Sequence, residues 1–396
     1  MLKNNIKKYK KIFILAGEES GDIIASELIK EVKNQIKGEY NLKFYGVTGS
    51  RMKSEGVHSV LDYSKINYLG FTDVVLNFLQ LKLRLHNLID KILNINPDVL
   101  ITIDAKVFSL SLAKSLKKSN KFNEFKLIHI VPPTIWAHRP SRANKWKGVF
   151  DILVSIIPNE DKFFKKYNIN TEYYGNPIFE NFLNKLNELN KKNHFIEKNK
   201  TTCLILPGSR KNEIYYNLDV LLKTVIKINS SYQEKIIWLL PTLDQFKNHI
   251  SNEISKYKLQ DDILIVDFEK SLEKIMLSKI AISCSGTATL QLSLLAIPTI
   301  AIYKTSFLNG LIAKLLVNFD NVVLPNFIVG QKVLPFLFQG KCNSENLHKL
   351  FCVIYEDYNK YKNKFLKLSM TLKSKIINNK YGFNNLLTKK IIKFLS

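Results

Sequence analysis

Short apolar runs rich in β-branched residues alternate with segments of helical spacing along most of the chain. Five such runs occupy residues 11–17, 42–49, 98–104, 126–133 and 151–158, and each ends close to a glycine, a proline or an aspartate. Residues 22–37, between the first two runs, carry apolar side chains at helical intervals. Strands that alternate with helices in this way form parallel sheets with helices on both faces. The pattern therefore predicts an α/β fold.

A second series of the same kind follows a polar stretch. Residues 184–202 are rich in lysine and asparagine, which is typical of a linker. Beyond Asn343 the chain is basic and has helical spacing to its end. Because 396 residues fit two domains, we expect two α/β domains with a cleft between them and one substrate on each side. The apolar runs of the second series lie at residues 202–210, 235–241, 262–268, 280–287 and 299–303.

The formal charge of +25, from 59 Lys+Arg against 34 Asp+Glu, points to an anionic partner. Nucleic acid, an acidic membrane surface and a phosphorylated substrate would each fit, and compositional drift in a lysine-rich chain is the alternative. A basic aromatic loop around Trp136, His138 and Arg139 could stack on nucleic acid, but no nucleic-acid-binding motif accompanies it. We therefore expect no nucleic-acid partner.

Neither a metal site nor an exported protein is expected. The four cysteines form no CxxC pair and the seven histidines show no ligand spacing, which favours a reducing cytoplasm. His129, inside an apolar run, is expected to be a core residue. The apolar run at residues 12–16 is too short for a signal peptide. Residues 280–303 carry no charge, but their small polar side chains favour a loop, a helix and a strand over a membrane span.

Two loops of the second series have side chains suited to a diphosphate. Ligands of parallel sheets bind just past the carboxyl ends of strands. One loop ends in Gly208, Ser209 and Arg210, and a guanidinium binds phosphate through paired hydrogen bonds. The other loop opens a helix, whose free N–H groups attract phosphate; it contains Ser285, Gly286, Thr287 and Ala288. A surface arginine and a helix packed through small residues remain the alternatives.

Two further strand ends carry acidic groups. Asp104 ends the run at residues 98–104, where it could serve as a general base or cap the following helix. Residues 16–22 (AGEESGD) could bind sugar hydroxyls through Glu18, Ser20 and Asp22, or simply cap a helix. This loop matches neither the dinucleotide-binding motif GxGxxG nor a Walker A loop.

Residues 67–93 are more apolar than one core-facing helix requires. This segment could lie at a membrane interface or contact acyl chains, or it could be a helix buried on both sides. The residues expected to contact membrane or acyl chain are Leu69, Phe71, Val75, Phe78 and Leu79.

Taken together, the motifs resemble those of the lipid-A-disaccharide synthases, glycosyltransferases of family 19, in order along nearly the whole chain. Several motifs in the right order are far more specific than any one of them. The matching blocks are AGEESGD at 16–22, GVTGSRMKSEG at 46–56, LGFTDVV at 69–75, PDVLITIDA at 97–105, VPPTIWAHR at 131–139, GNPIFE at 175–180, LPGSR at 206–210, CSGTAT at 284–289 and VLPNFIVG at 323–330.

The resemblance implies a GT-B fold, in which two Rossmann-like domains face each other across a cleft. Residues 1–180 would bind the acceptor and the membrane, residues 181–365 would bind the UDP-sugar, and the helical residues 366–396 would pack back on the N-terminal domain. The implied reaction moves a 2,3-diacylglucosamine unit from UDP-2,3-diacylglucosamine to 2,3-diacylglucosamine 1-phosphate with inversion, forming a β-1,6 disaccharide and UDP. It also implies peripheral attachment to anionic lipid on the cytoplasmic face of the inner membrane, without cofactor or metal, and it allows a homodimer.

The resemblance also assigns roles to single residues. Asp104 would take the proton from the 6-hydroxyl of the acceptor, and Trp136 and Arg139 would join Glu18, Ser20 and Asp22 in binding the acceptor sugar. Gln291 and Asn326 would complete the nucleotide site formed by the loops at 208–210 and 285–288.

Five positions depart from the family pattern. Lys106 replaces a common proline, His138 an aromatic residue and Asn176 a histidine, while Gln291 and Phe336 stand where acidic residues are usual. Another UDP-sugar transferase, a UDP-sugar epimerase and a non-catalytic relative that binds membrane or nucleic acid are therefore the alternative functions.

Overall fold

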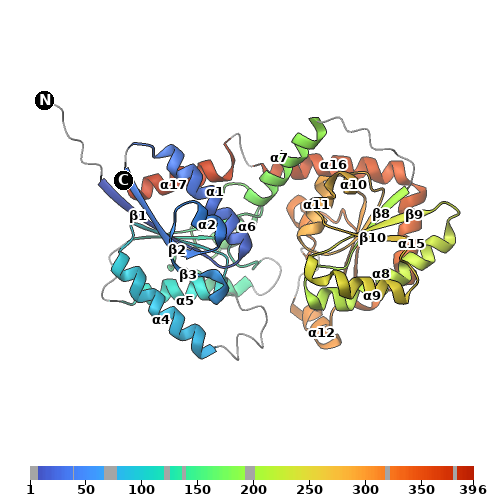
Figure 1. Cartoon of the computed structure of the whole chain (residues 1–396), viewed down its shortest axis with the longest axis horizontal. Coiled ribbons are helices and arrows are strands. Elements are labelled where there is room, and N and C mark those ends of the chain that lie inside the picture. The colour runs from blue at the N-terminus through green and yellow to red at the C-terminus, as the bar shows by residue number, and fades with distance from the viewer. Residues whose placement is uncertain are drawn as a thin grey trace. The chain divides into compact units, whose positions relative to one another are not determined.

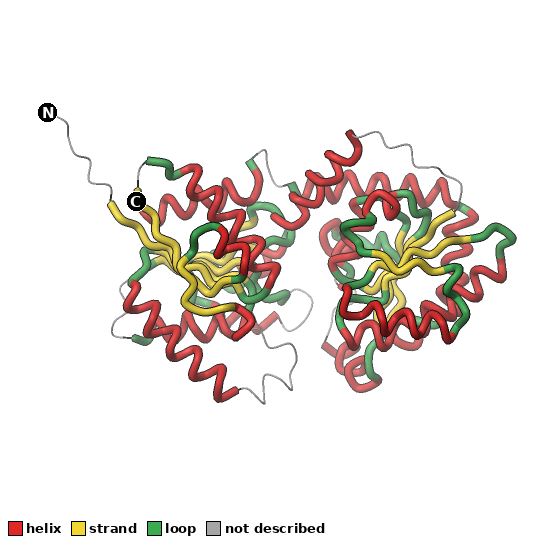
Figure 2. The backbone as a smooth tube through the Cα atoms, viewed as in Figure 1, coloured by secondary structure: helices red, strands yellow, loops and turns green. Residues whose placement is uncertain are grey.

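The structure, a computed structural model, describes residues 8–38, 40–66, 78–119, 125–135, 140–191, 201–316, 322–377 and 381–396. The chain forms two compact units. Unit 1 comprises residues 1–136, 140–181 and 376–396, and unit 2 comprises residues 137–139 and 182–375. Each unit contains its own parallel sheet with helices on both faces, as Figures 1 and 2 show. Residues 366–375, which we expected in the returning helical segment, belong to unit 2.

The sheet of unit 1 has seven parallel strands in the order β3-β2-β1-β4-β5-β6-β7. From β1 the chain winds outward through β2 to β3, and from β4 it winds the other way through β5 to β7, which is the doubly wound Rossmann-like order. The strands are β1 Lys8–Ala16, β2 Tyr40–Thr48, β3 His58–Asp62, β4 Val99–Ile103, β5 Lys126–Ile130, β6 Ile152–Ser155 and β7 Thr171–Tyr173.

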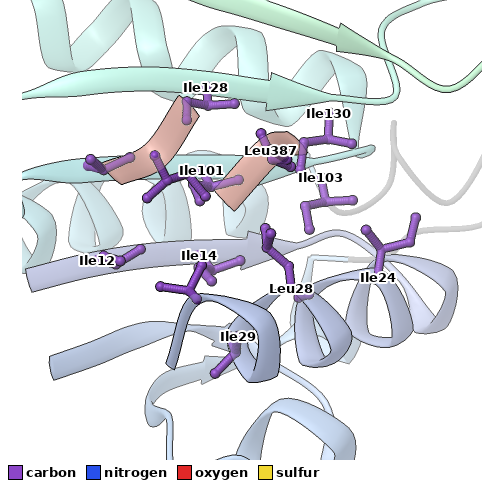
Figure 3. Packing of buried hydrophobic residues seen from close by; sticks show 14 of the residues in the cluster. Ile12, Ile14, Ile24, Leu28, Ile29, Ile101, Ile103, Ile128, Ile130 and Leu387 are labelled. Atoms are coloured by element: carbon purple, nitrogen blue, oxygen red, sulfur yellow. The ribbon is translucent and has the colours of Figure 1, made fainter. Parts of the chain in front are cut away.

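Both faces of this sheet are covered because successive strand residues point to opposite sides. On one face, Ile14 and Ile101 pack against Leu28 of α1 and Leu387 of α17, as Figure 3 shows. On the other face, the side chains next to them in sequence pack against α4 and α5. The helices of unit 1 are α1 Glu19–Gln35, α2 Ser50–Ser54, α4 Phe78–Ile95, α5 Lys106–Lys117, α6 Glu160–Lys165, α7 Pro177–Lys191, which continues into unit 2, and α17 Gly382–Leu395.

Unit 2 repeats the same topology with six parallel strands in the order β10-β9-β8-β11-β12-β13. Its core lies around the fully buried Trp238 of β9 and Phe351 of α15. The strands are β8 Thr201–Leu206, β9 Ile236–Pro241, β10 Ile263–Val266, β11 Ala281–Cys284, β12 Thr299–Tyr303 and β13 Phe336–Phe338. The helices are α8 Lys211–Ser231, α9 Lys247–Lys256, α10 Leu272–Met276, α11 Thr287–Leu294, α12 Phe307–Leu316, α14 Leu324–Val329, α15 Ser344–Glu356 and α16 Tyr358–Ile376, whose last residue belongs to unit 1.

The C-terminal helix α17 returns to the first unit. Phe383, Leu387, Ile391 and Leu395 are fully buried in the core that contains α1 and the strands of unit 1. The Phe383 amide donates a hydrogen bond of 3.0 Å to Glu180 Oε2 on α7. Residues at the two ends of the chain therefore complete one domain.

The linker predicted at residues 184–202 is wrong in its first part. Residues 184–191 belong to α7, whose leucines Leu183 and Leu186 are buried. Asn176 explains why this helix starts where it does: its Oδ1 accepts hydrogen bonds from the amides of Ile178 and Phe179, at 3.1 and 3.2 Å, as an N-cap residue does.

Candidate active site

In unit 1 the winding direction changes between β1 and β4, and ligands of doubly wound sheets bind at this place. The loops that follow these two strands touch. The Gly17 amide donates to the Ile103 carbonyl at 3.2 Å, and a Cβ on Gly17 would lie only 2.5 Å from Cβ of Ala105. Gly17 is therefore needed for the close approach that sets the opening acidic loop beside Asp104.

The backbone at this edge is strained. Asp104 and Ala105 have φ of 53° and 42°, and Val131, just after the neighbouring strand β5, has φ of 66°. Left-handed backbone costs free energy for residues other than glycine, most of all for β-branched ones. Such residues cluster at functional sites. The strain therefore supports a functional role for the carboxyl edge of β4 and β5.

The Asp104 carboxylate is a quarter exposed and pairs with the ammonium group of Lys106, with 3.3 Å between Nζ and Oδ1. Ala105, not Asp104, occupies the N-cap position of α5. The backbone carbonyl of Asp104 accepts a hydrogen bond of 2.9 Å from Ser109 Oγ. The side chain of Asp104 therefore lies at the carboxyl edge of the sheet, and it does not cap helix α5.

The polar side chains of the acidic loop after β1 have two different sets of partners. Ser20 Oγ donates to Glu18 Oε1 at 2.6 Å, so these two side chains form a pair. Asp22 is buried and accepts hydrogen bonds from the amides of Gly49, Arg51 and Met52, at 2.9, 2.9 and 3.2 Å. Both Asp22 oxygens therefore hold the start of α2, and of the three expected sugar-binding residues in this loop only Glu18 and Ser20 are partly exposed.

In unit 2 the winding direction changes between β8 and β11, the two strands that carry the predicted diphosphate loops. Gly208 has φ of 124°, and a Cβ there would lie 2.5 Å from Cβ of Glu213. Glu213 Oε2 accepts the amides of Ser209 and Arg210 at 3.0 and 3.3 Å, and its Oε1 lies 2.8 Å from Arg210 Nη1. The Arg210 side chain is nevertheless 81% exposed.

The N-terminus of α11 differs from that of α8. Glu213 occupies the first turn of α8, whereas the first turn of α11 contains no acidic residue. Gly286 is the N-cap residue, Thr287 is exposed, and the Ser285 amide is bonded to the Ile302 carbonyl at 2.8 Å. Gln291 lies half-buried one turn further along the same helix. The structure therefore leaves the amide end of α11 suited to an anion.

Asn217 is a structural residue of this site that the sequence did not single out. It is fully buried, and its Nδ2 donates to the carbonyls of Glu213 and Pro207 at 2.7 and 3.3 Å. Its Oδ1 accepts the Lys304 amide at 3.1 Å, just after β12. Asn217 thus ties the loop after β8 to the end of β12. Its position in the apolar stripe of α8, between Ile214 and Leu221, is the signal that could have revealed it.

Asn326, expected in the nucleotide site, is buried on α14. Its Oδ1 accepts the amides of Val333 and Leu334 at 3.0 and 2.9 Å, and its Nδ2 donates to the Leu334 carbonyl at 3.2 Å. In this structure its amide group shapes the loop before β13.

Other expected residues lie outside the described part of the chain. These are Leu69, Phe71, Val75, Trp136 and Arg139, together with the side chains of Phe78 and Leu79, whose backbone begins α4.

The described residues contain no group of three or more His, Cys, Asp or Glu side chains placed to hold a metal ion. Burial raises the pKa of the Cys203 thiol to about 12 and that of Cys342 to about 11, so neither is a nucleophile at neutral pH. Among the described helices, none combines the length and apolarity needed to span a bilayer.

Comparison with known proteins decides the family. A sequence model of the lipid-A-disaccharide synthetases matches residues 12–389. The lipid-A-disaccharide synthase of Rickettsia canadensis is 32% identical over 357 residues, 89% of each chain. That of Rickettsia prowazekii is 29% identical over 382 residues, 95% of each chain. The chain belongs to the lipid-A-disaccharide synthetase family. It is therefore a hexosyltransferase.

Solved structures share the fold of this chain at low sequence identity. The UDP-GlcNAc 2-epimerase of Neisseria meningitidis bound to UDP-GlcNAc aligns with a TM-score of 0.61 and 14% identity, over 97% of this chain and 99% of that one. A glycosyltransferase of Rickettsia africae aligns with a TM-score of 0.52 and 16% identity, over 98% of both chains. These likenesses confirm the GT-B fold predicted from the sequence.

Two departures from the synthetase pattern now have a structural explanation. Asn176 caps α7 through Oδ1 while its Nδ2 donates to the Ile156 carbonyl at 2.9 Å. Lys106, in place of proline, supplies the ammonium group beside Asp104.

Proposed function

We propose that this chain transfers 2,3-diacylglucosamine from UDP to 2,3-diacylglucosamine 1-phosphate, with inversion at the anomeric carbon. Family membership supports the reaction class. The observation that carries the proposal is that both Rossmann-like sheets place suitable groups at the change of winding direction. Asp104 lies there in unit 1, and Arg210 with the start of α11 lies there in unit 2.

In the proposed reaction, Asp104 is the general base. Its carboxylate accepts the proton of the acceptor 6-hydroxyl as that oxygen attacks the anomeric carbon of the donor. The bond from this carbon to the UDP oxygen breaks, and UDP leaves with the electron pair. A base positioned in this way typically contributes about 10²- to 10⁴-fold to a rate.

Protein groups would stabilise the charge that grows on the departing diphosphate. Arg210 offers a planar fork of N–H donors, and its exposure leaves it accessible to a ligand. The amide end of α11, at Gly286, Thr287 and Ala288, adds a second positive region. Gln291 is the candidate for the ribose hydroxyls, since an amide can accept and donate hydrogen bonds.

The acceptor and the membrane enter the proposal through the first 180 residues of the chain. Glu18 and Ser20 lie in the loop beside Asp104, and we assign them with Trp136 and Arg139 to the acceptor sugar. The apolar residues 67–79 would contact acyl chains at the cytoplasmic face of the inner membrane, where the excess positive charge of the chain attracts anionic lipid.

The general-base assignment is tested with Asp104→Asn. We expect disaccharide formation from the two acylated substrates to fall by about 10²- to 10⁴-fold, while UDP affinity stays unchanged because the nucleotide loops belong to unit 2. Asp357→Asn, exposed just after α15, is the control and should keep full activity. Normal transfer activity of Asp104→Asn would contradict the assignment of Asp104 as the general base. A C-2 epimer of the donor in place of a disaccharide would favour the epimerase alternative.

The diphosphate assignment is tested with Arg210→Ala. We expect UDP affinity, measured by calorimetry, to fall about tenfold or more, because a charge-assisted fork is lost. Arg210→Lys should recover only part of the affinity, since an ammonium group lacks the planar fork. Lys211→Ala, the exposed neighbour, is the control for charge alone. An equal loss in Arg210→Ala and Lys211→Ala would contradict a specific diphosphate contact.

A further inference from the structure

A cavity of about 840 Å³ lies in unit 2 beside β13, the edge strand of the sheet. Its walls come from the loop before β13, from β13 itself, from the turn after it, and from helices α12, α14, α15 and α16. The Asn326 side chain, through its three hydrogen bonds, fixes the loop that forms one wall. Cavities of this size hold ligands larger than a single phosphate ion.

The charged lining of the cavity has one sign. Lys314, Lys332, Lys341 and Lys364 line it, and none of its described lining residues is acidic. The Lys364 ammonium group is fixed on the wall by a hydrogen bond of 3.1 Å to the Val333 carbonyl. All four lysines are exposed, so an anion in this space could reach them, and lysine binds phosphate as a point charge.

The rest of the lining is mostly apolar and includes the aromatic residues Phe336, Phe338 and Tyr361. Phe336 and Phe338 alternate with Leu337 on β13, so they share one side of the strand, and their ring centroids are 6.3 Å apart. Ile354 of α15 and Tyr361 of α16 contribute apolar surface from the helices. The cavity therefore combines an anion-binding region with a wall suited to a hydrocarbon chain.

We propose that this cavity binds an amphiphile that carries a phosphate group. The lysines would hold the phosphate, and the aromatic wall would cover part of an alkyl chain. The proposed nucleotide loops at 208–210 and 285–288 do not contribute to its lining. Asn326, which the family resemblance assigned to the nucleotide site, does line the cavity, but its side-chain amide is bonded to Val333 and Leu334. The proposed binding does not depend on the proposed catalytic roles. A membrane phospholipid and a monomeric phosphate ester share this chemistry.

The test uses dodecyl phosphate below its micelle concentration and calorimetry with the full chain. We expect it to bind at least tenfold more tightly than inorganic phosphate and than the neutral dodecyl maltoside, because phosphate and chain both contribute. Equal affinity for inorganic phosphate, or for the neutral amphiphile, would overturn the proposal.

Two double variants test whether dodecyl phosphate binds in this cavity. Lys341→Gln with Lys364→Gln should weaken dodecyl phosphate binding by about tenfold. The matched control, Lys349→Gln with Lys367→Gln, removes the same charge from exposed positions of α15 and α16 outside the cavity lining. Equal loss in both pairs would show unspecific attraction and overturn the site.

The same variants distinguish the two sources of ligand. Sedimentation with phosphatidylcholine vesicles, with and without phosphatidic acid, is compared for the cavity pair and the control pair. Weaker binding to the phosphatidic acid vesicles by the cavity pair alone would support a membrane phospholipid as ligand. Unchanged vesicle binding, with dodecyl phosphate affinity still lost, would support a monomeric phosphate ester.

Discussion

At the scale of single residues, His129 shows how a buried polar group limits the stability of unit 1. Its ring lies on β5 with centroid distances of 4.7 Å to Trp146 and 5.1 Å to Phe150, and its Nδ1 lies 2.8 Å from Thr102 Oγ1. The expectation of a core histidine is confirmed, since the residue is fully buried. Burial, and to a lesser extent the charge of Lys106, lowers the pKa of His129 to about 3.

The lowered pKa of His129 predicts that unit 1 loses stability in acid. Between pH 6.5 and pH 3 the unfolded chain binds a proton at His129 that the folded chain excludes, so stability falls as pH decreases through this range. His129→Leu should lower the slope of unfolding free energy against pH by up to about 1.4 kcal/mol per unit. Denaturant titrations of unit 1 across this range measure the slope. His86→Leu, on the exposed surface of α4, should leave it unchanged; equal slopes in wild type and His129→Leu would contradict the assignment.

The residue types of the candidate site could be predicted from the sequence, but their backbone and partners could not. The end of an apolar run already marked Asp104, whereas its left-handed φ depends on packing against the loop of Gly17 and on the neighbouring strand. Asp22 illustrates the opposite case. A carboxylate in an acidic loop suggested sugar binding, yet its three amide partners lie 27 to 30 residues away, at the start of helix α2.

At the scale of elements, a continuous apolar run decided which strands could be predicted. All ten apolar runs correspond to strands, because buried parallel strands are continuous in β-branched residues. The strands β3, β7 and β13 have five, three and three residues and were missed. They lie at sheet edges, and stretches such as Thr171–Tyr173 and Phe336–Phe338 are too short to show a strand pattern. Their pairing with the neighbouring strands β2, β6 and β12 fixes them.

Helix α8 is held to the sheet by one polar residue, and this gives a prediction for the element. Asn217→Leu removes the bonds to Pro207, Glu213 and Lys304 and leaves buried backbone groups unpaired. We expect unit 2 to lose about 2–4 kcal/mol of stability. The Lys304 amide should exchange its hydrogen faster, which hydrogen exchange measures directly.

The control for this prediction lies one turn away. Asn212 is exposed in the first turn of α8, so Asn212→Leu should leave the Lys304 exchange rate and the stability of unit 2 unchanged. Slow exchange at Lys304 in Asn217→Leu would mean that Asn217 does not hold the end of β12.

At the scale of the whole molecule, the first domain depends on the last helix. The four buried apolar side chains of α17 contribute on the order of 10 kcal/mol, which is comparable to the stability of a whole domain. A chain shortened to end at residue 377 should therefore lose the fold of unit 1 and keep that of unit 2. Limited proteolysis should cleave unit 1 first; a protease-resistant unit 1 would contradict this dependence.

A single substitution tests the packing of α17 without shortening the chain. Leu387→Ala should destabilise unit 1 by about 2–5 kcal/mol, because it opens a cavity between α17 and α1. Lys389→Ala, exposed on the same helix, is the control. The helical tail could be read from the sequence, but its return to unit 1 rests on contacts such as Asn385 with Glu31 and Lys390 with Glu172, which span more than 200 residues.

The return of α17 also fixes an order of events during synthesis. Domains usually fold as they leave the ribosome, the N-terminal one first. In this chain the strands of unit 1 are made first, but the helix that closes their core is made after all of unit 2. Unit 2 can therefore fold while one face of the unit 1 sheet is covered by α1 but not yet by α17. During this period a chaperone or an early encounter with another chain would act on unit 1 alone.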